Sequence, residues 1–294
     1  MNIVDENEIG HPENVERVQS RGGELEVFRW TSVRGHTAVA AHGFLDHGRS
    51  WDGFAPHLRT IDLVSYSSRG HGHSDRADDY EWSDFVVDLA MVVRSTTNEP
   101  ADLIGHSMGA HLSLELARAC PNLVRRIVNI DGMLPNHGGR LLPELPERIR
   151  RTADRPNPDG GPVFPTIDDA AARRRELTPK IPAAFADTFA RHGTVPWPGG
   201  FRYSLDPMFM TGTLPWDGRF GPFDVAAAIA KADVPILLIT GGATEAPHLT
   251  PDRSAAVELG RLDHVEHVHF PDAGHYVHLE HPREVAAIIE EFLA

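Results

Sequence analysis

The sequence predicts an α/β fold, built on a mostly parallel, doubly wound sheet of about eight strands with an inserted, mainly helical cap. Short apolar segments alternate with amphipathic ones up to residue 131, and the alternation resumes at residue 234. Such alternation indicates parallel strands joined by helices that pack on both faces of one sheet. Between residues 133 and 222 the alternation stops, and prolines and glycines become frequent. We therefore expect a core formed by residues 1–132 and 223–294, interrupted by a cap at 133–222.

The first part of the core has the clearest strand and helix patterns. A turn signal at residues 21–23 (Arg-Gly-Gly) makes 24–30 the second arm of a hairpin. Buried strands are expected at residues 36–41, 61–66, 102–104 and 126–130. Helices are expected at residues 51–58, 82–96 and 110–119. Within 82–96 the apolar residues recur on one helical face, as packing against a sheet requires.

The cap and the second part of the core are less regular. Helices are expected at residues 145–153, 167–177 and 183–192, whereas 197–203 has an irregular pattern. The alternation then returns, with strands at 234–240 and 265–270, a helix at 251–259 and a terminal helix around 285–293. Because it returns, we interpret the cap as an insertion and not as an independent domain.

Composition and charge exclude several classes of function. The 294 residues carry a formal net charge of −14, which argues against nucleic acid or an anionic membrane as the main partner. The single cysteine, Cys120, allows no intrachain disulfide. The acidic N-terminus lacks the basic and apolar segments of a signal peptide, and no apolar run is long enough to span a bilayer. We expect a cytoplasmic enzyme or binding protein.

The most informative motif is Gly-His-Ser-Met-Gly at residues 105–109, between a predicted strand and a predicted helix. A serine flanked by two glycines in this context is typical of a nucleophile elbow. The sharp turn brings the positions two before and two after the serine too close for side chains. It also places Ser107 beside the unpaired N–H groups of a helix N-terminus. Ser107 is therefore the candidate nucleophile.

A serine nucleophile needs a base, and the base needs an orienting acid. His275 follows the last predicted strand. It is therefore expected at the same sheet edge as the elbow, the carboxyl edge at which ligands bind in open α/β sheets. Glu245, after the strand at 234–240, is the preferred acid. Asp131, at the end of the strand at 126–130, is the main alternative, and Asp252 and Asp272 are less favoured.

Acyl transfer also needs donors for the negative oxygen of a tetrahedral intermediate, usually two backbone N–H groups. Met108, directly after the serine, would supply one of them. Phe44, in the His-Gly-Phe segment that follows the strand at 36–41, would supply the other.

With these residues identified, the chain resembles the α/β-hydrolase fold superfamily over about residues 14–131 and 223–294. The resemblance rests on four motifs: His-Gly-Phe at 42–44, Arg-Gly-His-Gly-His-Ser at 69–74, the elbow, and Ala-Gly-His at 273–275 followed by Leu-Glu-His-Pro. It implies a serine hydrolase of the serine-hydrolase-like or carboxylesterase branch, with a cap inserted after the sixth strand.

The resemblance also bears on individual residues. It supports Glu245, because family members usually carry the acid in that loop, although Asp is commoner there than Glu. Because Glu is the less common acid at this position, Asp131 remains an alternative acid. Ser67 stands where Asp usually begins the loop before the Arg69 motif, and residues 246–248 lengthen the acid loop. A serine nucleophile also makes the dehalogenase and epoxide hydrolase chemistries of this fold unlikely, since those enzymes use Asp.

The predicted function is hydrolysis of small hydrophobic carboxylic esters, with lactones and thioesters as further candidates. Alternatives are a C–C bond hydrolase, a cofactor-free haloperoxidase or perhydrolase, and a non-catalytic small-molecule binder on the same fold. No cofactor is implied, and no histidine pattern on a helix indicates a functional metal site. A homodimer formed through the cap is an open alternative. The cap would roof an apolar pocket lined by Met133, Leu134, Trp197, Phe201 and Met208.

Overall fold

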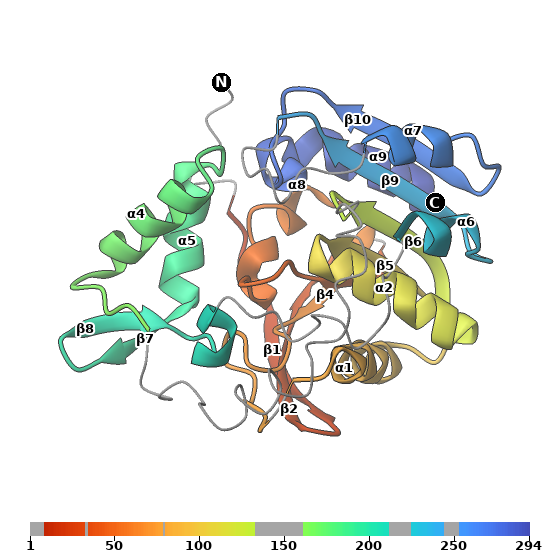
Figure 1. Ribbon diagram of the computed structural model, residues 1–294. Helices are drawn as coiled ribbons and strands as arrows, with labels where there is room; N and C mark the ends of the chain where they lie inside the picture. The colour runs from red at the N-terminus through yellow and green to blue at the C-terminus, as the bar shows by residue number, and fades with distance from the viewer. Residues whose placement is uncertain (1–8, 33–34, 79, 133–160, 212–224, 244–252) are drawn as a thin grey trace, which may run out of the picture.

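A computed structural model describes residues 9–32, 35–78, 80–132, 161–211, 225–243 and 253–294 (Figure 1). Its main sheet has eight strands in the order β1-β2-β4-β3-β5-β6-β9-β10. Their bounds are β1 (Asn14–Ser20), β2 (Gly23–Trp30), β3 (His36–Ala41), β4 (Ile61–Tyr66), β5 (Ala101–His106), β6 (Val124–Ile130), β9 (Ile236–Gly241) and β10 (Val265–Phe270). β2 pairs antiparallel with β1 and β4, and all other pairs are parallel. This confirms the predicted fold class.

Both faces of the sheet are buried, which explains why its central strands are continuously apolar. Alternate residues of a strand point to opposite faces. In β9, Ile236 and Leu238 join one hydrophobic cluster, while Leu237 and Ile239 join the other. Each side therefore has its own core, and the sheet separates them.

Helices cover the two cores. One core contains residues of α1 (Trp82–Thr96), α2 (Met108–Ala119), α6 (Val225–Ala230) and α7 (Arg253–Leu259). The other contains residues of α8 (Val277–Glu280), α9 (Pro282–Leu293) and two short 3₁₀ helices, η2 (Gly48–Trp51) and η3 (Ala55–His57). A further 3₁₀ turn, η4 (Pro121–Leu123), leads into β6. No helix in the described ranges combines the length and apolar character that a membrane span needs.

The described part of the predicted cap, residues 161–211, lies beside the sheet, is drawn in green in Figure 1, and contributes Phe185, Ala186 and Phe189 to one of the two cores. It contains α4 (Ile167–Leu177), α5 (Ala183–His192), the antiparallel hairpin β7 (Thr194–Trp197) and β8 (Gly200–Tyr203), and η5 (Pro207–Thr211). α4 begins with a capping box between Thr166 and Asp169, which satisfies N–H groups of its first turn. The helices expected at 167–177 and 183–192 are thus confirmed.

Two local expectations were wrong. Residues 197–203 belong to the β7–β8 hairpin, because Gly199 and Gly200 adopt φ of 89° and 147° and allow the tight turn. Instead of one helix at 51–58, the chain forms two short 3₁₀ segments, η2 and η3, and Pro56 lies in the first turn of η3. The helix expected at 145–153 and the cap boundaries at 133 and 222 lie outside the described residues.

Candidate active site

Ser107 occupies the turn between β5 and α2, in the strand–turn–helix context that the sequence predicts. Its backbone has φ 51° and ψ −111°, which costs a residue with a side chain about 1–3 kcal/mol. Two hydrogen bonds hold the turn: the Ser107 N–H donates to the carbonyl oxygen of Ile130 at 3.0 Å, and the Ala110 N–H donates to that of Ser107 at 3.1 Å. The serine is 5% exposed.

The two flanking glycines are required by close backbone contacts. A Cβ on Gly105 would lie 2.4 Å from the backbone nitrogen of Ala110. A Cβ on Gly109 would lie 2.0 Å from the carbonyl oxygen of Ala41. The second contact shows that the N-terminus of α2 packs directly against the end of β3. The glycines thus bring the start of α2 to the edge where β3 and β5 end.

His275 is oriented by Asp131. His275 lies in the loop between β10 and α8, and its imidazole Nδ1 is 2.7 Å from Asp131 Oδ2. The other carboxylate oxygen, Oδ1, accepts the Gly241 N–H at 2.9 Å, and the Asp131 N–H donates to the Ile239 carbonyl at 2.7 Å. Asp131 is fully buried, whereas the His275 side chain is 10% exposed. The carboxylate is therefore fixed on both sides.

This contact favours the second of the two acids that the sequence offered. The carboxylate that meets His275 is the alternative, Asp131, and Glu245 lies outside the described residues. The physical reason is strand order: β6 lies between β5 and β9, so its end adjoins both the elbow strand and the β9–β10 edge. Asp131, at the end of β6, therefore lies close to the loop that carries His275.

Backbone strain is concentrated at this edge. In the described ranges, the non-glycine residues with positive φ are Leu45 at 64°, Ser107 at 51° and Asp131 at 47°. They follow three neighbouring strands, β3, β5 and β6. Such conformations persist only where the surrounding structure imposes them, and they cluster at functional sites.

The predicted oxyanion donors lie on neighbouring strand ends. Met108 is the first residue of α2, and Phe44 lies shortly after β3. β3 and β5 pair directly, with Ala41 opposite Gly105. The Phe44 ring packs edge-on against Phe209 with centroids 5.8 Å apart. The oxyanion role of the two N–H groups stays a prediction.

A buried polar network beside the site was missed by the sequence analysis. Asp46 accepts hydrogen bonds from Tyr276 Oη at 2.9 Å and from Arg174 Nη2 at 2.5 Å. Arg174 Nη2 also donates to the tyrosine oxygen. His106 Nε2 donates to the carbonyl oxygen of His275 at 3.0 Å. The network therefore joins helix α4 to the loop after β3 and to the residues around His275.

The charge states in this network follow from burial and pairing. Burial alone would raise the pKa of Asp46, but Arg174 and the neighbouring His106 hold that pKa well below its usual range. Burial lowers the pKa of His106 and raises the pKa of Tyr276. At neutral pH the network thus holds one anion and one cation, with neutral histidine and tyrosine.

Sequence proximity could have indicated part of this network. Asp46 stands two residues after Phe44, and Tyr276 directly follows His275. Both positions adjoin residues already assigned to the site. Arg174, by contrast, is one of several arginines in the cap, and no local pattern distinguishes it.

A cavity lies between the cap and the loop after β3. Its lining comes from both parts of the chain: Leu45, Asp46, His47, Gly72, Arg174, Leu177, Phe189, Gly193, Tyr203, Ser204 and Leu205. None of Trp197, Phe201 and Met208 lines this cavity. Instead, Trp197 stacks under the Arg202 guanidinium at 3.6 Å, within the β7–β8 hairpin.

The remaining predicted lining residues lie elsewhere or outside the described residues. The backbone of Phe201 bridges to Phe164 within the cap, and Met208 packs against one of the two main cores. Met133 and Leu134 lie outside the described residues. The described cavity is therefore built from other cap residues than the sequence suggested.

The chain is similar in sequence to known hydrolases. Residues 38–288 match the family described as "Alpha/beta hydrolase family". A 2-(acetamidomethylene)succinate hydrolase of Mesorhizobium japonicum is 28% identical over 232 residues, which are 78% of this chain and 77% of that protein. Lipase LipV of Mycobacterium tuberculosis is 26% identical, with 92% of this chain and 98% of that protein covered.

Solved structures show the same arrangement of elements. The thioesterase domain from the curacin biosynthetic pathway superposes with a TM-score of 0.81 over 95% of this chain and 99% of that domain. Its sequence identity is 21%, so this likeness concerns the fold alone.

Proposed function

Because the chain belongs to the α/β-hydrolase family, we propose that it is a serine hydrolase that cleaves carboxylic esters through an acyl-enzyme on Ser107. The observation that carries the proposal is the hydrogen bond between His275 Nδ1 and the buried Asp131 carboxylate. It lies at the sheet edge where Ser107 is held in a strained turn. Nucleophile, base and acid are thus supplied by three strand ends of one edge.

The contact between Asp131 and His275 determines what the imidazole can do. An ionised carboxylate only accepts, so Nδ1 must carry the proton and Nε2 keeps its lone pair. In this tautomer Nε2 acts as general base toward the Ser107 hydroxyl. It then protonates the leaving alcohol and activates water for deacylation. The N–H groups of Met108 and Phe44 would hold the oxyanion in both steps.

The cavity beside the site supports small, largely apolar substrates. Leu45, Leu177, Phe189 and Leu205 supply apolar surface, and the polar groups are few, as in most small-molecule sites. Arg174 Nε is buried without a hydrogen-bond partner among the described residues. This leaves one donor beside the cavity for a substrate oxygen. Esters of short hydrophobic acids or alcohols fit this lining, with lactones and thioesters as related candidates.

Labelling with a fluorophosphonate probe, together with hydrolysis of p-nitrophenyl butyrate, tests the proposal. The wild type should label covalently and turn over the ester, whereas Ser107→Ala should do neither while remaining folded. Ser113→Ala is the matched control, because Ser113 lies in the same helix and its hydroxyl donates to the Gly109 carbonyl. It should label like the wild type.

Two results would refute the assignment. One is a folded wild type that fails to label, and the other is Ser107→Ala labelling as fast as the wild type. Ester turnover alone does not separate esterase, C–C hydrolase and perhydrolase activities, since all three share the proposed nucleophile. A panel with diketone substrates and peracid formation separates them.

A further inference from the structure

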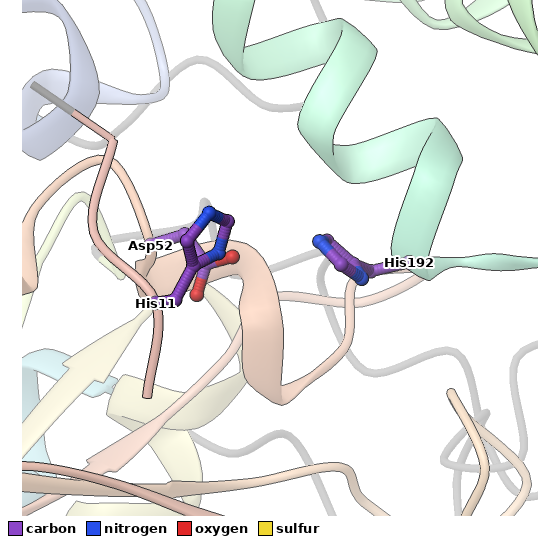
Figure 2. Close-up of side chains that lie close together, drawn as sticks. All are labelled: His11, Asp52 and His192. Atoms are coloured by element: carbon purple, nitrogen blue, oxygen red, sulfur yellow. The ribbon is translucent and has the colours of Figure 1, made fainter. Parts of the chain in front are cut away.

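A cluster of polar side chains outside the candidate active site surrounds a single nitrogen atom. Arg49 Nη2 lies 3.0 Å from His11 Nδ1, 3.1 Å from His192 Nε2 and 2.6 Å from Asp52 Oδ2. Figure 2 shows the three acceptor side chains, which come from three separate segments of the chain. Two imidazoles and one carboxylate therefore all contact the same guanidinium nitrogen.

The backbone at each of the three residues has a defined position in the fold. His11 is placed by the neighbouring Gly10, whose N–H donates to the Asp52 carbonyl oxygen at 2.9 Å. Asp52 ends η2, and its side chain is fully buried. His192 is the last residue of α5, the helix end whose dipole favours a positive charge. The cluster thus joins the N-terminal segment, the core and the cap.

The pairing defines what these groups offer. A guanidinium only donates, so His11 Nδ1 directs a lone pair toward it, and so does one nitrogen of His192, whose Nε2 and Nδ1 lie 3.1 Å and 3.4 Å from Arg49 Nη2 and Nη1. Two imidazole lone pairs and one carboxylate oxygen form a ligand set that suits zinc and similar transition metals. The three ligand atoms lie within 4.8 Å of one another. With Zn–N distances of about 2.0–2.1 Å, the imidazoles need to move inward by about 1 Å.

We propose that His11, Asp52 and His192 bind a divalent transition metal, such as Zn²⁺, which replaces the Arg49 guanidinium at this point. The exchange keeps Asp52 paired, because a buried carboxylate needs a cation and either group supplies one. Metal binding requires Arg49, whose side chain is 13% exposed, to swing away from Asp52. The bound metal has three protein ligands and one position for water. It ties the end of α5 to the core, and so fixes the cap.

No sequence pattern indicates this metal site, because its ligands are far apart in the chain. The ligands stand 41 and 140 residues apart, with no spacing that indicates metal binding. Only the folded chain brings them together.

Titration of the metal-free, full-length protein with ZnCl₂ in a calorimeter tests the proposal. We expect one zinc ion per chain in the wild type, and binding at least about tenfold weaker in His11→Ala and in His192→Ala. Arg49→Met should bind zinc at least about tenfold more tightly, because the competing cation is gone while an apolar stem remains over Phe28. His281→Ala, which removes a histidine outside the cluster, is the control and should match the wild type.

Thermal unfolding provides a second readout that needs no enzyme activity. Without metal, Arg49→Met should unfold at a lower temperature than the wild type, because Asp52 loses its cation. Zinc should restore the melting temperature of this variant but not that of an Arg49→Met, His192→Ala double variant. The proposal is overturned if neither the wild type nor Arg49→Met binds zinc stoichiometrically. It is equally overturned if His192→Ala binds as the wild type does, or if His281→Ala loses the site.

Discussion

Replacing Asp131 by Asn should abolish most of the activity through a change of tautomer. Asp131 Oδ1 already accepts the Gly241 N–H at 2.9 Å, so the Asn oxygen will keep that bond. Its NH₂ group then faces His275 Nδ1, where the carboxylate now lies at 2.7 Å. An NH₂ group donates, so Nδ1 must accept and the imidazole proton moves to Nε2. With Nε2 protonated, His275 has no lone pair for the Ser107 proton.

The size of the effect follows from the role of the acid. In known triads, changing the acid to its amide lowers kcat by about 10⁴-fold, which corresponds to about 5.4 kcal/mol of transition-state stabilisation. Because the substitution is isosteric and Asp131 does not line the described cavity, KM should change little. Stopped-flow or steady-state hydrolysis of p-nitrophenyl butyrate measures kcat, and circular dichroism verifies the fold.

Glu245→Gln serves as the comparison for this experiment, because it removes the charge of the acid that the sequence favours. It should keep kcat within about threefold of the wild type, the range of a side chain outside the triad. If Glu245→Gln loses 10³-fold or more while Asp131→Asn stays active, the contact between His275 and Asp131 does not define the catalytic acid.

Two further predictions concern stability. Gly109→Ala places a Cβ 2.0 Å from the Ala41 carbonyl oxygen, so urea unfolding should show a loss of about 3 kcal/mol; a change below about 0.5 kcal/mol contradicts the close packing. Burial lowers the pKa of His47 and His71 to about 3 and that of His111 to about 4, against 6.5 in the unfolded chain. Below pH 6.5 the unfolded state therefore binds more protons, and the free energy of unfolding should fall as the pH drops from 6.5 to 4, by up to about 1.4 kcal/mol per histidine and pH unit. Urea denaturation between pH 7 and pH 4.5 measures this, and a flat profile shows that these histidines titrate alike in both states.

Local sequence patterns were sufficient for the fold and for proposing two candidate site residues. Ser107 and His275 are each identified by the segment around them: a glycine-flanked turn in one case, and a loop after the last strand in the other. The burial of β9 on both faces is likewise visible as a continuous apolar run. These features depend on neighbours within a few residues, and a single sequence contains that information.

The acid and the polar network depend on distant neighbours. Asp131 and Glu245 both follow strands, and only the position of β6 between β5 and β9 brings Asp131 within reach of His275 Nδ1. Arg174 meets Asp46 across 128 residues of sequence. No periodicity or motif encodes such a pairing, because it arises when the cap packs on the core.

The positive-φ backbone at Leu45, Ser107 and Asp131 also bears on how this protein can be made more heat-resistant. Relaxing any of these turns would release about 1–3 kcal/mol, yet it would displace a group that the proposed reaction needs in place. Stabilising substitutions at these positions therefore conflict with turnover, in the familiar trade-off between stability and activity. Engineering for thermal tolerance should begin on exposed helix surfaces, such as that of α9, which carries none of the proposed site residues.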